Sequence, residues 1–231
     1  MKTLIHALGR KYQSTILQRE YAAKKFVRFN ERPVELAFVF RCIARCAPKS
    51  ILDVGTGETA LPALMAYCGP VVTAIDNVRD YWTAGMTNRH WYVIDDDISR
   101  TKLNAQFDMV TCISVLEHVV DPLPAVRNMV RLLKPGGYWV LAGPYTDAEH
   151  VDDTYKVPGA DPTSANMPYI CRSYSRQDLD LWLRETNCEL VEDEYWRTWS
   201  GRHWALGERI APPQPATKES GTHSCLLIRK I

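Results

Sequence analysis

The chain has 231 residues, 46% of them hydrophobic and 24% charged, with a formal net charge of +1 at pH 7. This length fits one α/β domain that buries roughly 70–75% of the surface of the unfolded chain. The near-neutral charge excludes the global basic field that non-specific nucleic-acid binders use.

Cysteine usage and hydropathy indicate the class of protein. Seven cysteines at scattered spacing, without a C-x-x-C pair, argue against a disulfide framework or a zinc site. A reducing, cytoplasmic setting is therefore expected. No stretch approaches the ~20 apolar residues that a membrane span needs.

The first 32 residues are basic, with eight Lys or Arg side chains against Glu20 and Glu31. Three interpretations are open: the solvated face of a helix, a patch for an anionic substrate or membrane surface, and an Arg-rich targeting peptide. A solvated face is the commonest reason for such a charge run. The segment also continues without a break into Phe29, Pro33 and Leu36, which is typical of folded structure.

Apolar runs of strand length alternate with amphipathic segments of helix length between residues 50 and 143. Strands are expected at 50–55, 71–76, 91–94, 108–113 and 138–143, and helices at 59–68, 78–85 and 121–133. This alternation predicts parallel strands with helices on both faces of a doubly wound sheet.

The rest of the chain departs from this rhythm. Residues 144–173 form a long segment without periodic apolar content, and because it follows a strand, we expect it at the ligand edge of the sheet. A helix begins after Ser175, and two last strands are expected at 189–196 and 223–231. Between them, Pro212, Pro213 and Pro215 predict a surface loop.

The strongest motif, L-D-V-G-T-G-E-T-A, spans residues 52–60 between the first strand and the first helix. Gly55 and Gly57 allow a tight turn and close approach of the backbone to a ligand. Asp76 ends the next strand about twenty residues later, where a carboxylate can accept hydrogen bonds from a ribose diol. The pattern predicts a nucleoside site rather than a purely structural turn. Read as G-x-G-x-x-A it also fits NAD, so spacing alone leaves the cofactor open.

Further motifs follow in order: D-D-D-I at 95–98, F-D-M-V at 107–110, V-L-E-H-V at 115–119 and L-K-P-G-G at 133–137. Together with L-D-V-G-T-G, they resemble the motifs of class I S-adenosylmethionine-dependent methyltransferases. The chain differs at Thr59, where the family commonly has a third glycine.

The resemblance implies S-adenosylmethionine as the cofactor. Asp97 would face the adenine amino group, and Ile98 would pack on the ring. The expected cofactor-binding residues are Asp53, Gly55, Thr56, Gly57, Asp76, Asn77, Asp97, Ile98 and Ser114.

The resemblance also implies the complete fold, because the family ends with an antiparallel hairpin on the sheet. We expect one α/β domain with a doubly wound, Rossmann-like sheet of seven strands, mostly parallel with an antiparallel C-terminal strand, and helices on both faces. Its parts are an N-terminal helical lid (1–46), a cofactor-binding core (47–143), an acceptor-side insertion (144–173) and a C-terminal helix and hairpin (174–231).

Catalytic candidates stand where strands end. His118 is the most visible candidate base, although L-E-H is shared by relatives with diverse acceptors and thus also suggests a structural role. Tyr145 and His150 follow the next strand at the same edge, and each is also interpretable as a loop-surface residue. No metal is expected, because Asp152 and Asp153 beside His150 lack a recognisable ligand spacing.

An aromatic cluster near the C-terminus either walls an acceptor pocket or packs under the hairpin. It consists of Tyr195, Trp196, Trp199, His203 and Trp204.

The favoured function is methyl transfer to a small-molecule or glycan-type acceptor at oxygen. The chain has S-V-L-E at 114–117, where exocyclic-amine methyltransferases carry an N-P-P-Y-type tetrapeptide. Alternatives are an RNA methyltransferase that uses the basic N-terminal segment and a non-catalytic methyltransferase-like scaffold, with an NAD-dependent dehydrogenase as a remote one. A nucleic-acid partner is not expected, and the sequence does not predict an oligomeric state.

Overall fold

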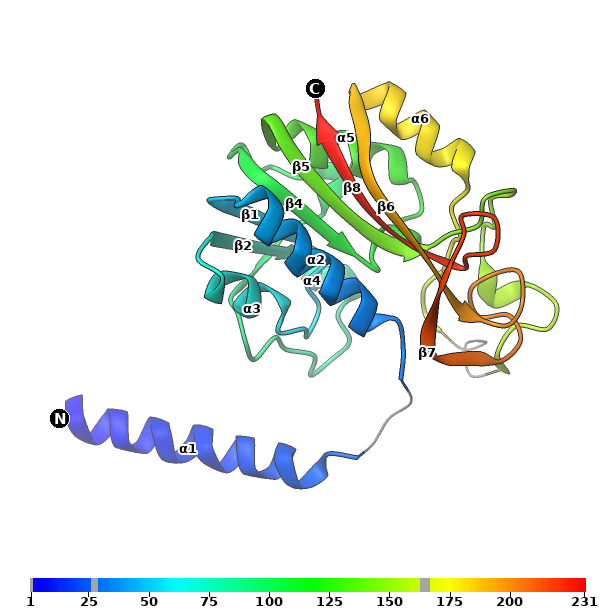
Figure 1. Cartoon of the computed structure of the whole chain (residues 1–231). Coiled ribbons are helices and arrows are strands. Elements are labelled where there is room, and N and C mark those ends of the chain that lie inside the picture. Colours follow the sequence, from blue (N-terminus) through cyan, green and yellow to red (C-terminus); the bar gives the residue numbers. More distant parts are fainter. Residues whose placement is uncertain (1, 26–28, 163–166) are drawn as a thin grey trace.

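The computed structural model describes residues 2–25, 29–162 and 167–231 (Figure 1). Its strands are β1 (Ser50–Val54), β2 (Val71–Asp76), β3 (Val93–Asp95), β4 (Phe107–Ile113), β5 (Leu133–Pro144), β6 (Cys188–Trp199), β7 (Arg209–Ala216) and β8 (His223–Lys230). Its helices are α1 (Lys2–Ala23), α2 (Arg32–Cys46), α3 (Leu61–Tyr67), α4 (Val78–Tyr81), α5 (Pro122–Arg131) and α6 (Arg176–Thr186). Short 3₁₀ turns are η1 (Ile98–Arg100), η2 (Leu116–His118) and η3 (Thr154–Lys156).

All the strands belong to a single sheet with the order β3-β2-β1-β4-β5-β8-β6-β7. The strands from β3 to β5 run parallel, whereas β8 runs antiparallel to both of its neighbours. The mostly parallel, Rossmann-like sheet with an antiparallel C-terminal part is thus confirmed.

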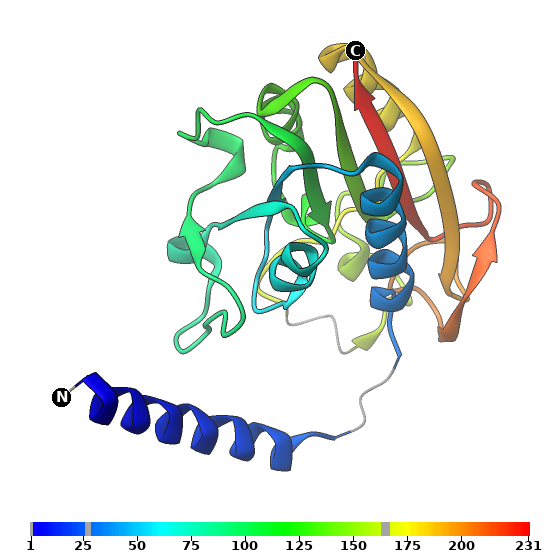
Figure 2. The ribbon, with the colours of Figure 1, turned by 60° about the vertical axis from the view of Figure 1, so that its left-hand side comes forward.

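Helices cover both faces of the sheet (Figure 2). Successive residues of a strand point to opposite faces. Ile51 accordingly packs in a buried cluster with Phe38 of α2 and Met65 of α3. Its neighbour Leu52 belongs to the cluster on the other face, where α5 contributes Met129. The continuous apolar sequence of the central strands follows from this double burial.

The expected number of seven strands is wrong, because the sheet has eight. The additional strand is β7, which contains the prolines that were expected to form a surface loop. Among the described residues β7 pairs with β6 alone and forms the edge of the sheet, with Pro215 opposite Trp196. Proline lacks an N–H group but is tolerated in an edge strand, whose outer side has no partner to bond.

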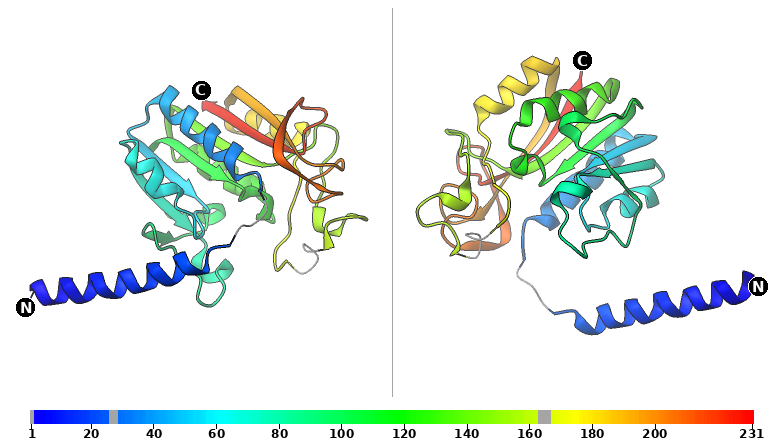
Figure 3. Two further views of the ribbon diagram at one scale, coloured as in Figure 1. Left: turned by 60° about the horizontal axis from the view of Figure 1, so that its bottom comes forward. Right: turned by 180° about the vertical axis from the view of Figure 1, so that it is seen from behind.

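The two N-terminal helices differ in position. Helix α2 packs against β5 and β8. Its residues Phe38, Val39, Cys42 and Ile43 are buried. Helix α1 instead extends away from the sheet and its covering helices (Figures 1 and 3). In the described part of the segment expected to act as a lid, α2 packs on the sheet and α1 does not.

Candidate functional site

The site lies at the carboxyl edge of the parallel strands. From β1 the chain adds β2 and β3 on one side of the sheet and then returns to add β4 and β5 on the other side. The order of the strands therefore reverses between the neighbouring strands β1 and β4. Ligands bind at such a switch point in open α/β sheets. The residues that directly follow β1 and β4, Gly55 and Ser114, therefore lie at the expected position.

Gly55 is a glycine because two constraints meet there. Its φ angle is +73°, which L side chains rarely adopt. A Cβ atom at this position would also lie 2.3 Å from Cγ2 of Val115, the second residue after β4. The turn after β1 is therefore packed directly against the turn after β4. At Gly57, whose φ angle is +56°, the nearest atom to an added Cβ is Cε of Met86, at 3.9 Å, so a side chain there would have room.

Asp53 lies beneath this turn and is 2% exposed. Its Oδ2 accepts a hydrogen bond from Thr56 Oγ1 (2.7 Å), and its Oδ1 accepts one from Thr111 Oγ1 (2.7 Å). Thr59 closes the turn by donating from Oγ1 to the carbonyl of Thr56 (2.9 Å), at the position where related turns have a third glycine. Asp53 thus fixes the turn to β4 from below.

Asp76 stands at the end of β2, as the spacing predicts. Its Oδ2 accepts a hydrogen bond from the backbone N–H of Gly57 (2.7 Å), which brings the carboxylate to the glycine turn. Asn88, which the sequence pattern did not single out, donates from Nδ2 to the carbonyls of Gly57 (2.8 Å) and Thr59 (2.9 Å). The segment between α4 and β3 therefore folds over the turn and fixes its shape.

The adenine side of the expected site lies after β3. Asp97 caps η1, accepting a hydrogen bond from the N–H of Ser99 (2.9 Å), and pairs with Arg100 Nε (3.1 Å). Ile98 is 6% exposed and packs in the cluster that includes α5. Asn77 precedes α4, and its side chain makes no capping hydrogen bond.

Ser114 leads to a buried ionic network that sequence analysis missed. Its Oγ donates to Oε1 of Glu35, a fully buried residue of α2. The same carboxylate is 2.9 Å from Nη1 of Arg32 and 3.1 Å from Nε2 of His223, the first residue of β8. Burial alone would raise the pKa of Glu35, but His223, Arg32 and Ser114 together hold it well below its usual value. The network connects α2, β4 and β8 at the ligand edge.

Glu117 in η2 is also buried, at 4% exposure. Burial raises the pKa of this carboxyl from 4.5 to about 8, reinforced by the negative charge of Glu35. At neutral pH Glu117 is therefore mostly protonated.

This raised pKa predicts a pH-dependent stability. Between pH 4.5 and 8 the unfolded chain releases the Glu117 proton while the folded chain retains it, so stability falls as pH rises. The free energy of unfolding of the unmodified chain should fall between pH 5 and pH 8. In Glu117→Gln we expect this fall to be smaller by about 2–4 kcal/mol. Urea unfolding at both pH values measures this. Glu189→Gln, at a half-exposed pair with Arg229, is the control; an unchanged pH dependence in Glu117→Gln would contradict the assignment.

His118 follows Glu117 at the end of η2. Its Nδ1 lies 2.7 Å from the carbonyl oxygen of Ile170, and the ring of Tyr169 contacts it edge-on at 4.5 Å. A carbonyl only accepts hydrogen bonds, so Nδ1 carries the proton and Nε2 carries the lone pair. Oε1 of Glu117 lies 4.0 Å from Nε2. Burial lowers the pKa of His118, which favours the neutral ring with its lone pair on Nε2.

The two other catalytic candidates have different surroundings. Tyr145 is 2% exposed and donates its hydroxyl to Asp147 (2.9 Å), and burial raises the pKa of the phenol. His150 pairs through Nδ1 with Asp178 (2.9 Å), the residue that forms the capping box of α6, and lies 3.3 Å from Asp152. Both side chains are thus engaged in holding the segment after β5.

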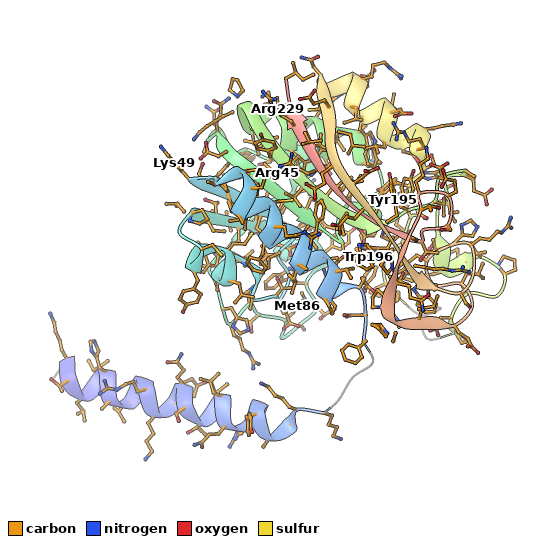
Figure 4. All side chains as sticks on the ribbon, in the orientation of Figure 1. Arg45, Lys49, Met86, Tyr195, Trp196 and Arg229 are labelled. Atoms are coloured by element: carbon orange, nitrogen blue, oxygen red, sulfur yellow. The ribbon has the colours of Figure 1, made fainter. Side chains whose placement is uncertain are left out.

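Aromatic rings extend from His118 toward β7. Tyr169 is followed by Tyr155 (6.4 Å between centroids), then by Trp204 (6.0 Å) and Trp199 (5.8 Å). Indole Nε1 of Trp199 and of Trp204 is buried without a hydrogen-bond partner in the part of the chain that the structure describes. Of the expected aromatic cluster, Tyr195 instead packs on Tyr145 at 5.1 Å; Figure 4 labels it beside Trp196.

The described residues, 2–25, 29–162 and 167–231, contain neither a metal-binding cluster nor a membrane-spanning helix. They contain no group of three or more His, Cys, Asp or Glu side chains placed to hold a metal ion. They also contain no helix that is long and apolar enough to cross a membrane.

A family model described as a methyltransferase domain matches residues 23–193, most of the chain. The chain belongs to the methyltransferase domain family. It is an S-adenosylmethionine-dependent methyltransferase, and its glycine turn lies at the ligand edge of the sheet with the Asp76 carboxylate beside it. An NAD-dependent dehydrogenase is no longer a candidate.

Curated relatives of this methyltransferase carry the name ubiquinone biosynthesis O-methyltransferase. One from Alkalilimnicola ehrlichii is 28% identical over 171 residues, which are 68% of each chain. Another from Haemophilus ducreyi is 36% identical over 105 residues, 41% of this chain and 44% of the relative. The match thus spans less than half the length of that second relative.

Solved structures share the fold. A putative methyltransferase from Bacillus halodurans matches with a TM-score of 0.58 and 18% identity over 84% of this chain and 98% of that one. The 1,6-didemethyltoxoflavin-N1-methyltransferase of Burkholderia thailandensis, solved with its substrate and S-adenosylhomocysteine, matches with a TM-score of 0.57. Its identity is 16%, and the match covers 97% of this chain and 89% of that one.

Proposed function

We propose that this methyltransferase acts on a hydroxyl oxygen of a small, planar acceptor, with His118 as the general base. The observation that carries the proposal is the hydrogen bond from Nδ1 of His118 to the carbonyl of Ile170, which leaves Nε2 basic at the ligand edge. A hydroxyl acceptor benefits from such a base because its proton must leave as the oxygen attacks.

Bound S-adenosylmethionine supplies a methyl group that is already activated on a positively charged sulfur. The chain mainly has to bind and orient the reactants, which can contribute roughly 7–11 kcal/mol. In our proposal Asp76 accepts hydrogen bonds from the ribose, while Gly55 and Gly57 allow close approach of the backbone. Asp97 and Ile98 face the adenine, and Ser114 lines the side toward β4.

The acceptor would lie along the row of rings beyond His118. Planar molecules stack favourably on aromatic side chains. The unpaired indole N–H groups of Trp199 and Trp204 supply donors for oxygen atoms of the acceptor. Their burial means that an acceptor without such oxygens would leave them unsatisfied, which costs free energy.

The curated relatives support the same reaction type. Their name describes O-methylation, and one of them matches this chain over 68% of its length. Oxygen as the accepting atom therefore has support from both the relatives and the His118 geometry.

We expect catechol to be methylated faster than 1,2-diaminobenzene, which has amines in place of the hydroxyls. His118→Asn should lower the rate with catechol about 100-fold while leaving the affinity for S-adenosylmethionine unchanged. Formation of S-adenosylhomocysteine, followed by mass spectrometry, measures the rate. His6→Asn on α1 is the control. Preference for the diamine would contradict O-methylation, and an unchanged rate in His118→Asn would exclude His118 as the base.

A further inference from the structure

Helix α1 is exposed along its whole length. It runs for 22 residues and extends away from the sheet and its covering helices (Figures 1 to 3). Of its described side chains, all are exposed except that of Ile16, which is half-buried. An isolated helix of this length is marginal in water, because most helical stability in proteins comes from packing of one face. The helix thus has a face available for a partner.

One side of α1 gathers most of its large apolar side chains, while Leu17 and Tyr21 lie on the other. Leu4, Leu8, Tyr12 and Ile16 recur every four residues and share one side of the helix, with Ile5 beside them. Leu4 is 65% exposed, Leu8 60% and Tyr12 73%. Exposed apolar side chains scattered singly are ordinary, whereas a continuous stripe over several turns marks an interaction surface.

Helix α1 and the two lysines that follow it are strongly basic. Residues 2–25 contain six Lys or Arg residues and one acidic residue, a net charge of +5. Since the whole chain has a net charge of +1, the remainder carries −4. Lys11 lies three residues after Leu8 and seven after Leu4, which places it at the border of the apolar stripe. A partner of α1 must therefore be both anionic and able to bury apolar side chains.

These two properties select among partners. A nucleic acid would neutralise the cations but leave the stripe of Leu4, Leu8 and Tyr12 in water. Pairing with α1 of a second copy would bury the stripe but bring two helices of like charge together. The surface of an anionic bilayer satisfies both, since apolar side chains enter the headgroup boundary while Lys and Arg meet lipid phosphates. The helix would lie on the bilayer, because no helix among the described residues is apolar enough to span it.

We propose that α1 binds the surface of membranes rich in anionic lipid and holds the methyltransferase body there. The apolar stripe faces the acyl chains, and the basic side chains at its border extend to the phosphates. This inference does not depend on the proposed O-methylation, since α1 lies apart from the glycine turn and from His118.

Co-sedimentation of the full chain with lipid vesicles tests the proposal. The vesicles contain equal parts of phosphatidylglycerol and phosphatidylcholine, or phosphatidylcholine alone. The expected result is binding to the anionic vesicles that weakens at high salt, with little binding to the neutral ones. Absence of binding to both, or equal binding to both, would overturn the proposal.

Two pairs of variants localise the interaction. Leu8→Gln should weaken vesicle binding about tenfold, whereas Leu17→Gln, nine residues away on the opposite face, should have a much smaller effect. Lys11→Glu should weaken it fivefold or more, whereas Lys218→Glu, the same charge change on the body, should not. Unchanged affinity for S-adenosylmethionine shows that each variant is folded.

Two other outcomes would also overturn the proposal in favour of another partner. In the first, the chain does not bind vesicles but binds a single-stranded RNA in a salt-sensitive way, and Lys11→Glu abolishes that binding. This result would assign α1 to nucleic acid. In the second, the chain does not bind vesicles but self-associates in sedimentation velocity, and Leu8→Gln abolishes the self-association. This result would assign the apolar stripe to a second copy of the chain.

Discussion

Gly55→Ala is expected to lower the affinity for S-adenosylmethionine at least tenfold and the free energy of unfolding by about 2–5 kcal/mol. The positive φ angle of +73° costs an L residue about 1–2 kcal/mol. The new Cβ also falls 2.3 Å from Cγ2 of Val115, and such overpacking costs about 1–3 kcal/mol. Relief of this clash moves the two turns apart where the cofactor binds. Calorimetric titration and urea unfolding measure the two effects.

Gly136→Ala is the matched control. Gly136 has the same φ of +73°, but no atom lies within 4 Å of an added Cβ in the described structure. The substitution Gly136→Ala should lower the free energy of unfolding by about 1–2 kcal/mol through the φ angle alone and leave the affinity for the cofactor unchanged. Val115→Ala added to Gly55→Ala should recover part of both losses. Equal behaviour of Gly55→Ala and Gly136→Ala would show that contact with Val115 has no role.

Glu35→Ala is expected to destabilise the protein by about 3–5 kcal/mol at pH 7. The substitution leaves Arg32 and the fully buried His223 without the carboxylate that neutralises them. The hydrogen bond that holds Ser114 is lost as well. Because the pKa of Glu35 is lowered, its contribution is complete above pH 4.5 and fades as pH falls below that value. Urea unfolding at pH 7 and pH 3.5 measures both expectations.

Glu192→Ala is the matched control for charge and connectivity. Glu192 of β6 also pairs with α2, through Arg45 (Figure 4), but both side chains are partly exposed. Exposed ion pairs are worth about 0–1 kcal/mol, so little loss is expected. Similar losses in both variants would contradict the importance of the buried network.

The central part of the fold was predictable because its signals are local. Strands β1, β2 and β4 are apolar runs that end in turns, and their burial on both faces makes those runs continuous. The glycine turn and Asp76 follow from a spacing of about twenty residues within one unit. Strand β7 was not predictable, because prolines ordinarily indicate a loop and its pairing at the sheet edge depends on β6.

The buried network shows a different limit. Glu35 shares the spacing of Phe38, Val39 and Cys42 on the buried face of α2, so the sequence held a signal of a buried carboxyl. Its partner His223 is far away in the sequence, and only the folded sheet brings them together. Asn88 stands in an irregular segment whose contact with the glycine turn has no sequence pattern.

The candidate catalytic residues could be proposed but not ranked from sequence. His118, Tyr145 and His150 all follow strands at one edge, and the sequence does not reveal their partners. The carbonyl of Ile170 sets the tautomer of His118, whose Nε2 is 4.0 Å from the Glu117 carboxyl, whereas His150 lies within 3.3 Å of two carboxylates. That difference is the physical reason for preferring His118 as the base.

Calorimetric titration with S-adenosylmethionine, with NAD⁺ as the control ligand, tests the location of the cofactor site most directly. Micromolar binding of S-adenosylmethionine and none of NAD⁺ is expected for the unmodified chain. Asp76→Ala should weaken binding at least tenfold, whereas Asp80→Ala, an exposed residue of nearby α4, should not. Unchanged affinity in Asp76→Ala would contradict a cofactor site at the glycine turn, and binding of NAD⁺ in place of S-adenosylmethionine would contradict the identity of the cofactor.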